Sequence, residues 1–211
     1  MLKKLVVGSI FFLVSGISFA QNFPSQQWHK GKVVLISEDT VAGLVKYDFE
    51  NEMIQLNVNN SIQAFSARKI LYFDIFDASI DAYRFFYALP YKEKNSYQNY
   101  EVPRIFEVLY EGKITLLARE EIVTETMPQY NYYYYRPEWN QMRNRLAYDF
   151  FFLELNGQIK HYNMKKKELV NMFGKHSAEI KQYMKKNRLK HDSLRDLVRI
   201  TAYYNALVGK S

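Results

Sequence analysis

The residues of this chain that could exchange protons or hold a metal are few. It has no cysteine, which excludes thiolate nucleophiles, disulfides and thiolate zinc sites. Its four histidines are too far apart in the sequence for a metal-binding spacing such as H-E-x-x-H: His29, His161, His176 and His191. We therefore predict no metal site, no cofactor and no catalytic residue that the sequence can name.

Glutamates near one predicted hairpin are the remaining candidates for acid–base chemistry. They are Glu107, Glu111, Glu120 and Glu121. Two carboxylates that face one cleft are what a glycosidase requires. Glutamates at strand edges and turns also keep a sheet from pairing with other chains. An enzyme that acts on polysaccharide is therefore one possible function, ranked below the two binding functions given at the end of this section.

The segment 129–139 has an unusual composition, with five tyrosines, an arginine and a tryptophan in eleven residues, and with prolines at 128 and 137. Flat amphipathic rings of this kind are typical of binding loops, because they give contact area at a small entropic cost. Alternate rings could instead pack on a sheet. The candidate binding residues are Tyr130, Tyr132, Tyr133, Tyr134, Tyr135, Arg136 and Trp139.

Positive charge is concentrated at the C-terminus. Residues 164–211 contain 12 Lys and Arg against 4 Asp and Glu, whereas residues 21–163 contain 15 against 18. Such a segment is a solvated helix face, a docking surface for the acidic remainder of the chain, or a site for an anionic glycan or lipid headgroup. The candidate anion-binding residues are Lys165, Lys166, Lys185, Lys186 and Arg188.

We expect β-strands over most of the chain, and these strands would position the candidate residues. With 48% hydrophobic and 24% charged residues, the composition is that of a folded globular protein and excludes a disordered or polytopic membrane protein. Short alternating runs in residues 31–89 predict an antiparallel meander or a small SH3-like barrel. Hairpin turns at 111–112 and 156–157 predict a second antiparallel sheet that could extend the first, so 21–163 is an antiparallel β region.

A helical period replaces the alternation after residue 163. Three short helices are predicted, over 164–173, 178–186 and 193–208, with apolar residues on one face of each. The apolar faces indicate that the basic helical region 164–211 docks on the β region. The fold class is therefore α+β.

Residues 1–20 read as a secretory signal peptide, with a basic start at Lys3 and Lys4, an apolar run, and small residues at Ser18 and Ala20. We expect cleavage between Ala20 and Gln21, and a periplasmic or extracellular protein that no longer crosses the membrane. Two short D-[ST]-aliphatic patterns, at Thr40 and Ser193, match weakly the acceptor sites of O-linked glycans and also suit a turn and a helix cap.

Several segments together resemble a family of exported bacterial proteins that has no assigned activity. They are Trp28 to Val33, Ala64 to Ile70, Phe106 to Gly112, Leu116 to Glu120, and Tyr203 to Asn205. The resemblance covers most of the chain after the signal peptide. It implies export and one shared architecture, and it carries over no site residue.

These observations favour an exported, non-enzymatic binding or structural protein of the bacterial envelope that contacts another protein through the Tyr-rich segment. The alternative is a module for anionic glycan or lipid headgroups. We expect no nucleic-acid partner. The surface would distinguish the readings: a flat aromatic patch favours a protein partner, and a groove with rings and facing carboxylates favours sugar chemistry.

Overall fold

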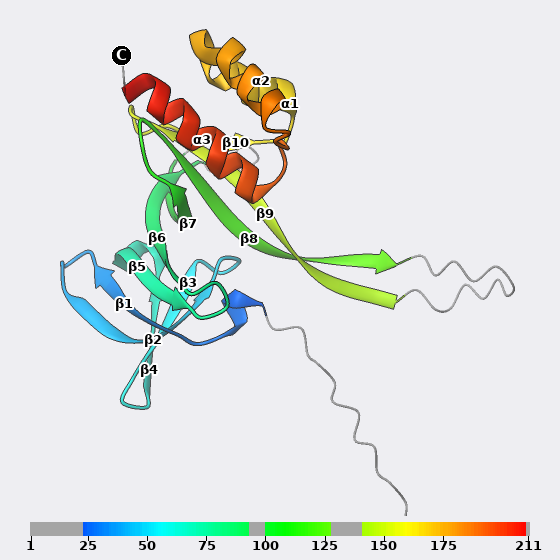
Figure 1. The fold of residues 1–211 in the computed structure, drawn as a ribbon. Helices are drawn as coiled ribbons and strands as arrows, with labels where there is room; N and C mark the ends of the chain where they lie inside the picture. The colour runs from blue at the N-terminus through cyan, green and yellow to red at the C-terminus, as the bar shows by residue number, and fades with distance from the viewer. Residues whose placement is uncertain (1–22, 93–99, 128–140, 210–211) are drawn as a thin grey trace, which may run out of the picture.

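The computed structural model describes residues 23–92, 100–127 and 141–209, which form an antiparallel sheet with a layer of helices at one end (Figure 1). The predicted α+β class is confirmed. The predicted signal peptide, residues 1–20, lies outside the described residues. Within the described part of the chain, no helix is long and apolar enough to cross a membrane.

The described strands all belong to one sheet, in the order β10-β9-β8-β7-β6-β5-β1-β2-β3-β4. Every neighbouring pair is antiparallel, and β6 joins β7 directly, so the second set of strands extends the first and is not a separate sheet. The strands are β1 (His29–Leu35), β2 (Thr40–Asp48), β3 (Met53–Val58), β4 (Ser61–Ser66), β5 (Ile70–Asp77), β6 (Ala82–Tyr91), β7 (Val102–Tyr110), β8 (Ile114–Met127), β9 (Gln141–Glu154) and β10 (Ile159–Tyr162).

One face of the sheet buries side chains along nearly its whole length. Around β1 to β7 it holds an aromatic and aliphatic core that includes Tyr47, Phe73 and Phe86, each 1% exposed or less. Gly31 and Gly43 lie opposite each other in β1 and β2. On its other side Gly31 faces β5, where a Cβ would come within 2.0 Å of the Asp74 carbonyl oxygen. Only glycine therefore permits β1 and β5 to approach this closely.

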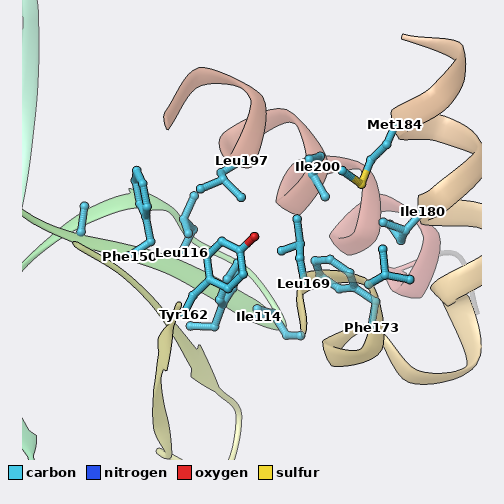
Figure 2. Close-up of a cluster of buried hydrophobic side chains, with 13 residues drawn as sticks. Ile114, Leu116, Phe150, Tyr162, Leu169, Phe173, Ile180, Met184, Leu197 and Ile200 are labelled. Carbon is cyan, nitrogen blue, oxygen red and sulfur yellow. The ribbon is translucent and has the colours of Figure 1, made fainter. Parts of the chain in front are cut away.

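The helices cover the same face at the β7–β10 end. They are α1 (Lys166–Met172), α2 (Ser177–Lys186) and α3 (Leu194–Gly209), with single 3-10 turns at η1 (Pro24–Gln26), η2 (Ala67–Lys69) and η3 (Gly174–His176). Figure 2 shows Leu197 of α3 beside Leu116 and Phe150 of the strands, whereas Ile180 of α2 lies beside Phe173 and Met184 of the helices. The apolar helix faces are therefore buried in one cluster with strand residues.

β8 and β9 extend beyond their neighbours as a two-stranded arm, which projects from the body in Figure 1. β7 pairs with β8 only as far as Glu107 opposite Ala118, and β10 pairs with β9 only as far as Tyr162 opposite Phe150. Past these pairs, residues 119–127 and 141–149 have only each other among the described strands. We call these two segments the arm.

Side chains replace the strand partner at the point where β7 leaves β8. The main-chain N–H of Ile105 donates to Glu52 Oε2 at 2.8 Å, and its carbonyl accepts from Arg119 Nη1 at 2.8 Å. Arg119 Nη2 also donates to Glu52 Oε1 at 2.6 Å and to the Phe49 carbonyl at 2.7 Å. Because the backbone groups at the fork have partners, β8 can depart from β7 without leaving polar groups unpaired.

Candidate functional site

The outer side of β5 and β6 carries a surface of aromatic rings. Successive side chains of a strand point to opposite faces of a sheet. In β6 this alternation places Arg84 and Phe86 in the interior and leaves the rings on either side of them outside. We call the outer set the aromatic face, and it consists of Tyr72, Phe76, Tyr83, Phe85 and Tyr87.

Register between the two strands arranges these rings in cross-strand pairs. Tyr72 lies opposite Tyr87, with stacked rings whose centroids are 5.3 Å apart. Phe76 lies opposite Tyr83 in an edge-to-face contact, also at 5.3 Å. The rings therefore support one another on the sheet surface, which fixes their orientation without burying them.

Three of these rings are well exposed: Tyr83 at 62%, Phe85 at 44% and Tyr87 at 37%. Phe85 lies opposite Asp74, whose carboxylate is 3.5 Å from Lys32 Nζ on β1. That ion pair neutralises the charge at the centre of the surface. Burial raises the pKa of Tyr87, and the carboxylate of Glu111 adds to the effect, so this hydroxyl stays protonated and can donate a hydrogen bond.

A cleft of about 370 Å³ adjoins the aromatic face at Phe76. Trp28, 38% exposed, lines it together with Lys30. His29 also borders the cleft, but it is buried and its Nε2 lies 2.8 Å from the Pro24 carbonyl oxygen. It is buried because it falls on the inward side of β1 next to Tyr47.

The predicted glutamate group is divided between the interior and the surface. Glu107 and Glu120 both point into the sheet and converge on Arg84, whereas Glu111 and Glu121 are exposed. The guanidinium of Arg84 binds Glu107 through two parallel hydrogen bonds of 2.7 Å and binds Glu120 Oε1 at 2.5 Å. Sequence reasoning did not identify Arg84 as the centre of this group.

Every N–H group of the Arg84 guanidinium has a partner in the buried cluster. Arg84 Nη1 donates to Asp77 Oδ2 at 3.3 Å and to the Tyr47 hydroxyl at 3.2 Å, so all five guanidinium N–H groups are engaged. Tyr47 donates to the second oxygen of Glu120 at 2.9 Å. Burial raises the pKa of Tyr47 and of Glu120.

A larger cleft, of about 630 Å³, lies beside this cluster between the end of β2 and the base of the arm, with Tyr47 and Glu120 among its lining residues. Both carboxylate oxygens of Glu120 already accept hydrogen bonds from Arg84 and Tyr47. Both oxygens of Glu107 likewise accept hydrogen bonds, each from Arg84. The convergence of the two glutamates is therefore explained by charge neutralisation in the interior, and it does not supply a free acid–base pair.

The described residues contain no group of three or more His, Asp or Glu placed to hold a metal ion. The predicted anion-binding residues all lie on exposed positions of the helical layer. Lys165 and Lys166 are at the start of α1, Lys185 and Lys186 at the end of α2, and Arg188 just beyond it.

The Tyr-rich candidates lie outside the described residues: Tyr130, Tyr132, Tyr133, Tyr134, Tyr135, Arg136 and Trp139. The aromatic face was not predicted, although its signal is present in the sequence. Tyr83, Phe85 and Tyr87 alternate, which indicates that the three share one face of a strand. Phe86 lies between Phe85 and Tyr87, so both faces of the strand carry aromatic residues. The pattern therefore does not say which face is exposed to solvent.

Comparisons of the chain with protein-family models, with curated proteins and with solved structures found no match.

Proposed function

We propose that this protein is an exported, non-enzymatic binding protein of the bacterial envelope, and that its aromatic face docks on another protein. The observation that carries the proposal is the group of exposed, mutually supported rings on β5 and β6. Contiguous exposed apolar surface marks interaction sites, and Tyr and Phe are enriched where proteins meet. We keep the Tyr-rich segment 129–139 as a second predicted contact with the partner protein.

The chemistry of the surface favours a protein partner over a sugar. Phe76 and Phe85 have no polar edge with which to bond a hydroxyl-rich ligand. Asp74 is neutralised by Lys32 and is only 6% exposed, so it offers little to a sugar. A flat, nearly uncharged aromatic surface matches an apolar patch on a folded partner, which it would cover by ring contact.

Replacing Tyr83 and Phe85 with Ser tests the proposal. Outer cross-strand pairs contribute about 0.2–1 kcal/mol each, so the double variant should fold and melt near the wild-type temperature. Crosslinking followed by pull-down from the native envelope should recover a partner with the wild type and much less of it with the variant. Tyr100→Ser, which also removes an exposed ring, is the matched control. Equal recovery by all three proteins would refute the proposal.

Export is tested separately by intact mass. The protein recovered from outside the cytoplasmic membrane should begin at Gln21. Retention of residues 1–20 would contradict the cleavage that we propose.

A second candidate function, binding of an anionic glycan or lipid headgroup, rests on the helical layer. None of the five predicted cations forms an ion pair with a residue that the structure describes, and all five are exposed. Reversing Lys165, Lys166, Lys185 and Lys186 to Glu should preserve the fold and abolish salt-sensitive retention on phosphatidylglycerol vesicles. Unchanged retention would exclude these lysines.

We also propose that β1 to β5 form a small SH3-like barrel. The order β5-β1-β2-β3-β4, with the 3-10 turn η2 between β4 and β5, supports this description. The shared core of Val33, Val45 and Phe73 supports it as well. An experimental structure would test whether these strands close on themselves.

A further inference from the structure

A groove of about 480 Å³ lies along the free edge of β10, at the end of the described sheet. Four consecutive residues line it, from Gln158 to His161, so the groove follows the backbone of the strand and is not confined to one of its faces. α1 forms one wall with Glu168, Asn171 and Met172, whose spacing places them on one side of the helix. An exposed sheet edge is where proteins bind an extended peptide as an additional strand.

The hydrogen bonds of the β9–β10 hairpin show which main-chain groups face this groove. The Glu154 N–H donates to the Gln158 carbonyl at 3.0 Å, so these two residues form a hydrogen-bonded pair. Hydrogen-bonded and non-hydrogen-bonded pairs alternate along an antiparallel ladder. Ile159 and His161, one and three residues after Gln158, therefore occupy the non-hydrogen-bonded positions. Their N–H and C=O groups consequently point away from β9, toward the free edge.

These outward main-chain groups have no hydrogen-bond partner among the residues that the structure describes. Ile159 and His161 are two residues apart in an extended strand, which separates their main-chain groups by about 7 Å. The backbone of an extended peptide presents donors and acceptors at the same repeat. Such a peptide can therefore pair with both residues at once, through up to four hydrogen bonds.

Charge in the groove is balanced, so it does not select the occupant. Two lysines and two glutamates line it: Lys92, Lys160, Glu154 and Glu168. Lys160 Nζ lies 2.5 Å from Glu154 Oε1, and Glu168 accepts from the Asn163 carboxamide at 3.1 Å. A balanced groove does not favour a phosphate or another strongly charged ligand. Recognition therefore falls to main-chain pairing and to apolar contact.

Apolar groups lie on both sides of the strand edge. Met172 belongs to the cluster under the helices, whereas Ile159 and Tyr91 belong to the cluster on the opposite face of the sheet. The Tyr91 ring is held by edge-to-face contacts with Phe106 and Phe151, at 5.6 and 5.5 Å. Because alternate side chains of a strand point to opposite faces, successive side chains of an added strand would meet Tyr91 on one side and Met172 on the other.

We propose that this groove binds an extended segment of another protein as an additional strand, paired with β10 through Ile159 and His161. The central residues of the segment are uncharged, and apolar side chains at neighbouring positions contact the two walls. No residue of the aromatic face lines the groove, so this site is separate from the aromatic face.

Panning a phage-displayed library of random linear peptides on the purified protein tests the proposal, with a selected peptide resynthesised as the probe. In amide hydrogen exchange, the N–H groups of Ile159 and His161 should exchange quickly in the free protein. Their exchange should slow by about tenfold or more when the peptide is bound. The N–H of Lys160, which donates to β9, should be protected in both states.

Two variants at one position separate main-chain pairing from side-chain contact. His161→Pro and His161→Ala both lose the imidazole, but only proline removes the outward N–H, and neither removes a hydrogen bond of the β9–β10 ladder. His161→Pro should bind the peptide about tenfold or more weakly than His161→Ala in titration calorimetry. The double variant Tyr83→Ser, Phe85→Ser should bind the peptide like the wild type.

Failure to select any peptide would overturn the proposal. So would fast exchange of the Ile159 and His161 amides at saturating peptide, or protection of these amides already in the free protein. Equal affinities of His161→Pro and His161→Ala would show that the peptide does not pair with the edge. Loss of binding in the Tyr83, Phe85 double variant would place the peptide on the aromatic face. If His161→Pro does not fold, the exchange measurement on the wild type decides.

Discussion

Asn205 on α3 hydrogen-bonds to both main-chain groups of Ile114 on β8. Its Oδ1 accepts from the Ile114 N–H at 3.0 Å, and its Nδ2 donates to the Ile114 carbonyl at 2.8 Å. The same Nδ2 lies 3.1 Å from the Thr201 carbonyl within the helix. The carboxamide thus takes the place of a neighbouring strand at the first residue of β8, and it ties the last helix to the sheet.

Asn205→Ala should lower the free energy of unfolding by about 1–3 kcal/mol, because it leaves partly buried main-chain groups of Ile114 without partners. Urea unfolding followed by circular dichroism measures the change. Asn187→Ala is the control, since the Asn187 carboxamide donates only to the Tyr183 carbonyl, one turn earlier in the chain. A loss no larger than that of the control would mean that the contact with Ile114 contributes little.

Gly112→Ala should disturb the same contact from the other side. A Cβ at this position would lie 2.5 Å from Asn205 Cγ, and the carboxamide is held by its hydrogen bonds and cannot easily move away. We expect Gly112→Ala to destabilise the wild type by more than 1 kcal/mol and the Asn205→Ala variant by clearly less. Additive losses in this double-mutant cycle would show that the two positions act independently.

Removing Arg84 should be among the most damaging single changes in the protein. Its guanidinium is the shared partner of Asp77, Glu107 and Glu120, all buried, and three carboxylates would lose their counter-charge. We expect Arg84→Ala to reduce the free energy of unfolding by about 3–5 kcal/mol. Urea titration at neutral pH checks this, with the exposed Arg68→Ala as the control at less than about 0.5 kcal/mol.

Asp77 should make stability depend on pH. Its burial alone would raise the pKa, but hydrogen bonds from Ser79 and the charge of Arg84 outweigh it, so the pKa of Asp77 is lowered. A carboxyl with a lower pKa in the folded state stabilises the fold above its unfolded pKa of about 3.9, and this contribution is lost as the pH falls through the folded value.

Asp77→Asn should therefore be less stable than the wild type at pH 7, and the difference should shrink as the pH is lowered below about 4. Urea midpoints at a series of pH values measure it. A difference that is constant with pH would mean that the variant removes a packing contact and not a charge. Ser79→Ala, which deletes one hydrogen bond to Asp77, should show a smaller effect of the same sign.

Local sequence signals determined the elements of this protein. The turn at 156–157 joins β9 to β10, with Gly157 at a φ of +83° that glycine adopts at no steric cost. The helical period after residue 163 and its apolar faces predicted the packed layer. The first helix nevertheless starts at Lys166, later than expected, because Met164 has a φ of +54° and Lys165 is extended, so neither residue is helical.

Only the tertiary structure decided how these elements meet. Tyr47 and Glu120 are 73 residues apart, and the buried cluster that joins them to Arg84 exists because four further strands bring β2 and β8 to one interior. Alternation in the sequence shows which residues share a face of a strand. It does not show which of the two faces is buried by the rest of the fold. The aromatic face lies on a local hairpin of β5 and β6, but burial of its other side depends on β1 and β7 beside it. The fork at Ile105 depends on Glu52 and Arg119, which are 67 residues apart and which no local pattern brings together.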